Sequence, residues 1–167
     1  MNNTTMITID SSTKKTGIAV FVNGVYIEHH LIDHSKNLKM ENRYPHMCID
    51  LYNILETYKP EIIYIEDEVV SRNMNTCRFL FRLQGMIEGW CILNGAEFNT
   101  VRPTVWRSSL NFNQGRKFNR TDLKIQSIKF VKGVLNLNVT DDEADAICIG
   151  YYALNRFNIN WEPQKGV

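Results

Sequence analysis

The chain of 167 residues has only four cysteines and four histidines, and neither kind is clustered. The cysteines stand far apart, with no Cys-x-x-Cys pair, at positions 48, 77, 91 and 148. This spacing argues against a zinc site and against a disulfide framework, so the cysteines are interpreted as small hydrophobic core residues. The sequence shows no pairing of serine or cysteine with histidine of the kind that a covalent catalytic mechanism uses.

Long apolar runs and phosphate-binding glycine loops are missing as well. No stretch approaches the roughly 18 uncharged apolar residues that cross a bilayer, and the polar start MNNTTMITID does not resemble a signal peptide. The absence of a Gly-x-x-x-x-Gly-Lys loop argues against a nucleotide cofactor. We therefore expect a cytoplasmic protein without membrane association, in which residues 1–167 form one domain and residues 157–167 a loose tail.

The net charge of +1 conceals an uneven distribution along the chain. Between Arg102 and Lys132 there are eight basic residues and one acidic residue, a charge of +7, so the remainder of the chain carries −6. A basic segment is typical of a surface that contacts a phosphate backbone. Clustered acids are typical of a divalent metal site, so the separation of charge favours a nucleic-acid enzyme.

Apolar periodicity predicts three strands, then a helix, a strand, a helix, a strand and three helices. The first three strands cover residues 6–10, 16–22 and 25–32, and Asn23-Gly24 predicts a tight hairpin because both turn positions need positive φ. A helix is expected from Tyr44, with Pro45 in its first turn. The later strands are expected at 61–66 and 96–101. The later helices are expected at 75–94 and at 103–110, then from a cap at Thr121, and finally after a Thr140–Glu143 capping box.

The helix predicted for residues 75–94 is apolar on almost every side, more than one core-facing stripe requires. Gly85 and Gly89 stand four residues apart and would let another backbone approach closely. Two interpretations stay open: a central helix buried inside the monomer, or a homodimer interface that includes Phe81, Gly85 and Gly89.

Carboxylates occur where the predicted fold would gather them. If the fourth strand pairs with the first in parallel, Asp10 and Glu66 lie side by side at one edge of the sheet. Asp142 and Asp145 share one face of the last helix. Four such acids would repel one another unless a cation lay between them, and oxygen ligands favour Mg²⁺ or Mn²⁺, with two ions serving in phosphodiester hydrolysis.

Each acid also has a simpler explanation. Acids in a first helical turn are favoured by the helix dipole, which accounts for Asp142 and Asp145. Glu66 precedes Asp67 and Glu68 and could belong to a solvated strand end, and Asp10 could cap a turn. Three separate segments that bring acids to one edge favour the metal site over these explanations.

The segments ITIDSSTKKTGIAV, IIYIEDEVV and DDEADAICI resemble, in order and spacing, the three acidic motifs of the RuvC family of Holliday junction resolvases. QGMIEG resembles that family's dimer-interface helix, and the short, diverged chain looks like a bacteriophage-encoded member, which would act in the host cytoplasm. The resemblance implies a ribonuclease H-like α/β fold: a mixed five-stranded sheet of order 3-2-1-4-5, with strands 1–3 antiparallel, flanked by helices.

The resemblance further implies a homodimer that binds four-way DNA junctions and resolves them by paired symmetric nicks. It assigns metal binding and catalysis to Asp10, Glu66, Asp142 and Asp145, with Asp141 a competing candidate for the third position. Arg102 and Arg120 come nearest to the family's basic residues, and the further candidates for DNA contacts are Arg72, Arg78, Arg107, Arg116, Lys117 and Lys124. The chain departs from the family pattern at Ser11-Ser12, where Pro-Gly is usual, and at Val69, where an aromatic residue is usual.

Two rival functions use the same features. A ribonuclease H-type nuclease acting on RNA or RNA–DNA hybrids would need the same acids. A branched-DNA-binding protein without chemistry would need only the basic segment.

Overall fold

The sheet has the predicted order. The computed structural model describes residues 4–36, 39–67 and 73–156, and within them five strands form one sheet in the order β3-β2-β1-β4-β5. Strands β1, β2 and β3 form an antiparallel meander, and β4 and β5 run parallel to β1. The expected tail at 157–167, together with Val69 and Arg72, lies outside the described residues. The strands are β1 (Thr5–Ser11), β2 (Lys15–Val22), β3 (Val25–Asp33), β4 (Ile62–Glu66) and β5 (Glu97–Val101).

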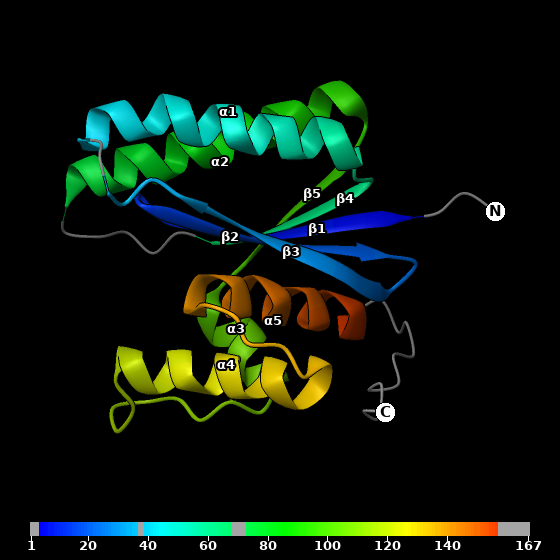
Figure 1. Cartoon of the computed structure of the whole chain (residues 1–167), viewed down its shortest axis with the longest axis vertical. Coiled ribbons are helices and arrows are strands. Elements are labelled where there is room, and N and C mark those ends of the chain that lie inside the picture. Colours follow the sequence, from blue (N-terminus) through cyan, green and yellow to red (C-terminus); the bar gives the residue numbers. More distant parts are fainter. Residues whose placement is uncertain (1–3, 37–38, 68–72, 157–167) are drawn as a thin grey trace.

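Helices cover both faces of this sheet (Figure 1). On one face lie α1 (Met40–Tyr58) and α2 (Met74–Asn94). On the other lie α5 (Asp141–Arg156) and the short α3 (Pro103–Ser109), with α4 (Arg120–Leu135) packed outside α5. None of the helices in the described part of the chain combines the length and apolar character that a membrane span requires.

Side chains that alternate along β1 pack into a hydrophobic core on each face of the sheet. Ile7 and Ile9 pack with the helices α1 and α2, while Met6 packs on the side of α5. Thr8 is also buried on the α5 side, where its hydroxyl donates a hydrogen bond of 2.7 Å to the carbonyl of Ala146. Because successive strand residues face opposite sides, one strand holds both layers of helices in fixed positions.

Two local sequence signals are confirmed by the backbone. Asn23 and Gly24 have φ values of 53° and 79°, as the hairpin between β2 and β3 requires. At the start of α5, the Thr140 amide donates to Glu143 Oε2 at 2.7 Å, and the Glu143 amide donates back to Thr140 Oγ1 at 3.4 Å. This reciprocal capping box fixes the first turn of the helix that carries two of the candidate acids.

Two helix starts differ from the prediction. Helix α1 begins at Met40, so Pro45 lies in the second turn and removes only the hydrogen bond to the carbonyl of residue 41. Helix α4 is capped by Asn119, not Thr121, because Asn119 and Asp122 exchange side-chain-to-backbone hydrogen bonds of 3.0 and 2.9 Å. Asparagine and aspartate at this spacing satisfy the backbone amides of Asn119 and Asp122, which have no partner within the helix.

Gly17 determines how closely α5 approaches the sheet. It lies on β2 directly opposite Asp10 of β1. A Cβ atom built at Gly17 would overlap the carbonyl group of Asp142 in the first turn of α5. The missing side chain therefore lets the helix backbone contact the strand beside Asp10.

We expect Gly17→Ala to lower the free energy of unfolding by about 1–3 kcal/mol, because the added methyl must displace helix backbone. Gly133→Ala is the matched control, since Gly133 lies on α4 with nothing within 4 Å of an added Cβ; it should stabilise the protein by roughly 0.5–1 kcal/mol. Urea unfolding measures both. Equal effects of the two substitutions would contradict the proposed contact.

Candidate active site

Four carboxylates from three different stretches of chain line one cavity of about 240 Å³. They are accompanied by three basic side chains and one leucine. The full lining is Asp10, Glu66, Arg107, Arg120, Leu123, Lys124, Asp142 and Asp145. A larger groove of about 480 Å³ shares Asp10, Glu66, Arg120 and Asp142 with this cavity and continues along the turn between β1 and β2.

The parallel pairing of β1 with β4 positions the first two carboxylates. Ile9 is the register partner of Ile65, so Asp10 and Glu66 follow at equivalent positions on the neighbouring strands. Adjacent strands lie about 4.8 Å apart, and both residues stand at the carboxyl ends of parallel strands. Such an edge is where α/β sheets bind ligands.

Helix α5 supplies the other two carboxylates from its first turns. Asp142 and Asp145 are three residues apart and both line the cavity, and Asp145 is only 6% exposed. The neighbouring Asp141 instead forms an ion pair with Lys124 of α4. Of the two adjacent candidates, the structure therefore brings Asp142 to the cavity.

Burial sets the electrostatics of the acids. It raises the pKa of Glu66 to about 7, against the opposing effects of a hydrogen bond from Trp106 and of the Arg107 charge. Burial also raises the pKa of Asp145 above its ordinary value. Removing a carboxylate from water disfavours its charged form, so both residues attract protons or other cations.

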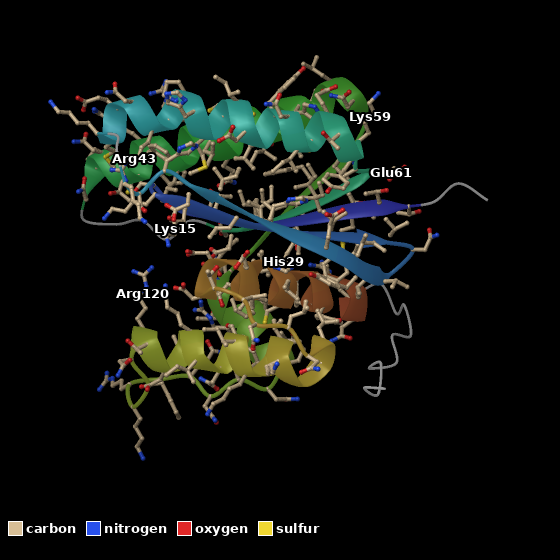
Figure 2. The ribbon with its side chains drawn as sticks, in the orientation of Figure 1. Lys15, His29, Arg43, Lys59, Glu61 and Arg120 are labelled. Atoms are coloured by element: carbon tan, nitrogen blue, oxygen red, sulfur yellow. The ribbon has the colours of Figure 1, made fainter. Side chains whose placement is uncertain are left out.

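Arg107 is the basic residue placed most directly among the acids. Its guanidinium Nη2 lies 3.5 Å from Asp145 Oδ2 and 3.9 Å from Glu66 Oε2. Arg120 projects from the beginning of α4 toward the sheet (Figure 2) and lines the cavity together with Lys124. Three of the predicted DNA-binding residues thus surround the carboxylates.

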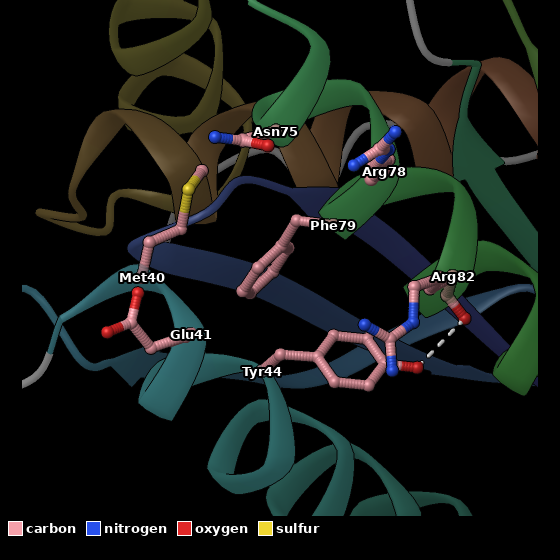
Figure 3. Close-up of a pocket in the computed structure, with 7 residues that line it drawn as sticks. All are labelled: Met40, Glu41, Tyr44, Asn75, Arg78, Phe79 and Arg82. Atoms are coloured by element: carbon pink, nitrogen blue, oxygen red, sulfur yellow. Dashed lines mark hydrogen bonds between the residues drawn. The ribbon is translucent and has the colours of Figure 1, made fainter.

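Four other predicted bases lie away from the carboxylate cavity. Arg102, Arg116 and Lys117 are exposed and do not line it. Arg78 lines a separate cavity of about 290 Å³ between α1 and α2, in which the Arg82 guanidinium lies 4.1 Å from the centre of the Tyr44 ring (Figure 3).

The donor chemistry of the cavity fits a hard divalent cation. All four acids offer oxygen, and Asp145 Oδ1 is buried without a hydrogen-bond partner among the described residues. Across residues 4–36, 39–67 and 73–156, however, no three His, Cys, Asp or Glu side chains are arranged to hold one ion. The cavity therefore fits a hard cation in the type of its ligands and in bringing them to one cavity.

Sequence analysis missed one residue that contacts the site. The indole Nε1 of Trp106 donates a 2.7 Å hydrogen bond to Glu66 Oε2, across a separation of 40 residues. A tryptophan in a short helix beside a basic residue carries no local signal of such a partner. Its position just after β5, which runs parallel to β4, is the feature that could have suggested it.

Comparison with known proteins gives a consistent result. No family model matches the chain. It is 29% identical, over 126 residues, to the crossover junction endodeoxyribonuclease RuvC of Caldicellulosiruptor saccharolyticus, covering 74% of this chain and 72% of that protein. The chain is thus similar to a RuvC endodeoxyribonuclease over about three quarters of its length.

Solved structures of resolvases share the fold. RuvC of Thermus thermophilus in complex with a Holliday junction substrate has a TM-score of 0.69 at 16% identity, covering 92% of this chain and 96% of that one. The fowlpox virus resolvase, also in complex with Holliday junction DNA, has a TM-score of 0.55 at 18% identity, covering 90% and 99%. The predicted ribonuclease H-like fold is confirmed, and the predicted enzyme class, an endonuclease, is that of the chain's homologues.

The raised pKa of Glu66 predicts a pH-dependent stability. A carboxyl group whose pKa is higher in the folded than in the unfolded protein costs stability once it ionises above pH 7, and the cost disappears as the pH falls through 7 toward 4.5. We expect Glu66→Gln, in buffer with EDTA, to raise the free energy of unfolding by roughly 1–3 kcal/mol at pH 8. Urea unfolding at pH 8 and pH 5 measures this gain, and a gain that is the same at both values would contradict the prediction.

Proposed function

We propose that this protein is a metal-dependent, structure-selective endodeoxyribonuclease that binds four-way DNA junctions as a homodimer and resolves them by paired symmetric nicks. The observation that carries the proposal is the single cavity in which Asp10, Glu66, Asp142 and Asp145 meet, with Arg107, Arg120 and Lys124 around them. Carboxylates for metal and bases for phosphate are the two requirements of phosphodiester hydrolysis.

The relatives support the choice of substrate. The curated relative is named for cleavage at crossover junctions, and two of the structural neighbours hold Holliday junction DNA. Their agreement favours a resolvase over a ribonuclease H-type enzyme and over a junction-binding protein without chemistry. The four acids in one cavity argue separately against the last of these.

We place the cleaved DNA strand in the groove that continues from the carboxylate cavity. The groove passes the β1–β2 turn, which offers Ser12, Thr13 and Lys14, and reaches Thr76 and Leu80 on α2. Hydroxyl groups and lysine suit phosphate and sugar contacts. The exposed bases Arg78, Arg102, Arg116 and Lys117 would extend the contact surface to the arms of the junction, and Arg72 stays a candidate outside the described residues.

We assign the binding of two divalent ions, Mg²⁺ or in its place Mn²⁺, to the four acids. Such ions, when bound, polarise the phosphate and lower the pKa of the attacking water. The chain's own contribution is to hold the oxygen ligands on rigid elements, while Arg107 and Arg120 offset the negative charge of the phosphate. The residues of the chain would form a single nuclease domain around the one sheet.

The homodimer is inferred from the outer face of α2. Phe81, Gly85, Gly89 and Ile92 follow one another at helical spacing, and we call them the α2 strip. Phe81 is 48% and Ile92 75% exposed, and nothing lies within 4 Å of a Cβ added at either glycine. One isologous interface on this strip would set two identical sites at a fixed separation, as paired symmetric cuts require.

The carboxylate assignment predicts which acids are essential. Asp10→Asn and Asp142→Asn should each reduce cleavage of a four-way junction about 100-fold or more, because each removes a charged metal ligand. Junction binding should be unchanged or tighter, since less negative charge opposes the phosphates. Asp141→Asn is the matched control and should retain cleavage within a few-fold, because Asp141 pairs with Lys124.

Cleavage is measured with magnesium on labelled four-way junction, duplex DNA and RNA–DNA hybrid side by side, and binding by mobility shift in EDTA. Preferential cleavage of the hybrid would favour the ribonuclease alternative. Full activity of the Asp10 or Asp142 variant would show that the carboxylate assignment is wrong.

The α2 strip predicts a dimer that one charge disrupts. We expect the wild type to have the mass of a dimer by light scattering at micromolar concentration, and Phe81→Glu to have that of a monomer. Ile27→Glu is the matched control, because Ile27 is 51% exposed on β3, away from the strip; this variant should remain dimeric. A monomeric wild type would overturn the dimer.

A further inference from the structure

Trp106 is buried completely although it belongs to a helix of seven residues. Its indole N–H donates the 2.7 Å hydrogen bond to Oε2 of Glu66. A buried indole N–H needs an acceptor, and a carboxylate is a strong one. The bond therefore serves both groups: it satisfies the indole and fixes one oxygen of a partly buried acid.

The indole cannot easily turn away from Glu66, because aromatic rings hold it in place. Trp106 packs edge-on against Phe112 at 5.9 Å between ring centres, Phe112 against Phe130 at 5.8 Å, and Phe130 against Tyr151 at 5.6 Å. This series joins α3 to α4 and α5. It fixes the direction of the N–H relative to the helix that carries Asp142 and Asp145.

The face of the same indole supports Arg107. The Arg107 guanidinium carbon lies 4.6 Å from the centre of the ring, within the range of a cation–π contact. From there its Nη2 reaches both Glu66 and Asp145. One side chain thus orients an acid through its edge and a base through its face.

We propose that Trp106 is a positioning residue of the active site, which holds the Glu66 carboxylate and Arg107 in the arrangement that a divalent ion needs. This inference rests on the proposed function, because it concerns the same carboxylates. Residues that orient metal ligands typically contribute 10-fold to 100-fold to metal affinity or activity.

The test is Trp106→Phe in the full chain, which keeps an aromatic ring and removes the N–H. Calorimetric titration with Mn²⁺ alone should give at least about a 10-fold weaker affinity than wild type. The Mg²⁺ concentration for half-maximal junction cleavage should rise in parallel, with activity partly restored at high Mg²⁺. Junction affinity in EDTA should stay within about two-fold, because Trp106 itself is buried.

Trp90 offers a matched control. It is 5% exposed on α2, and its indole Nε1 donates a hydrogen bond of the same length, 2.7 Å, to Oε1 of Glu56 on α1. Trp90→Phe removes the same kind of bond outside the carboxylate cavity. It should change stability to a similar degree and leave Mn²⁺ affinity unchanged.

The outcomes separate the two claims. A wild type that neither binds Mn²⁺ nor cleaves junctions would overturn the proposed function. A wild type that does both, with a Trp106 variant of equal Mn²⁺ affinity, would overturn the positioning role alone, as would equal losses in the Trp106 and Trp90 variants. If circular dichroism shows the Trp106 variant unfolded, Phe112→Leu carries the test: weaker Mn²⁺ binding supports the role, and unchanged binding refutes it.

Discussion

The parallel pairing of β1 with β4 is the constraint on which the site depends. It places Asp10 and Glu66 at equivalent ends of adjacent strands, and no local feature of either strand could do so. Helices are then needed to cover the two faces of a sheet whose central strands are buried. Of these, α5 reaches the same edge because Gly17 on β2 admits its backbone.

Gathering acids at a buried edge costs stability, and the surrounding side chains offset part of this cost. The pKa of Glu66 is raised to about 7 by burial even though Trp106 donates to it and Arg107 lies nearby. The remaining imbalance favours any cation that enters. A site arranged in this way gives up folding stability for affinity toward cations, a compromise that is usual at functional sites.

Much of the fold could be predicted because its signals are local. Asn23-Gly24 specified a hairpin through its backbone conformation, and Thr140 with Glu143 specified a helix start through two hydrogen bonds. The predicted start of α4, with Thr121 as its cap, was wrong. Both Asn119 and Thr121 can cap a helix, and the hydrogen bonds between Asn119 and Asp122 decide between them.

The site could be predicted only in part, because its partners are distant in sequence. Spacing alone brought Asp10 and Glu66 together once a strand pairing was assumed. The contact of Trp106 with Glu66 depends on where α3 leaves the sheet, and the position of Arg107 follows from that of Trp106. Neither the Trp106–Glu66 contact nor the position of Arg107 produces a periodic pattern in the sequence.

The run of three acids at the start of α5 shows how geometry resolves what composition leaves open. Successive helical residues point about 100° apart, so three neighbours cannot share one partner. Glu143 turns back to cap Thr140, Asp141 turns out to Lys124, and Asp142 remains to line the cavity. Each of the three acids thus has its own partner or place. The capping box and the ion pair fix the rotation of the helix about its axis, and that rotation brings Asp142, with Asp145 one turn later, to the edge where the two strands end.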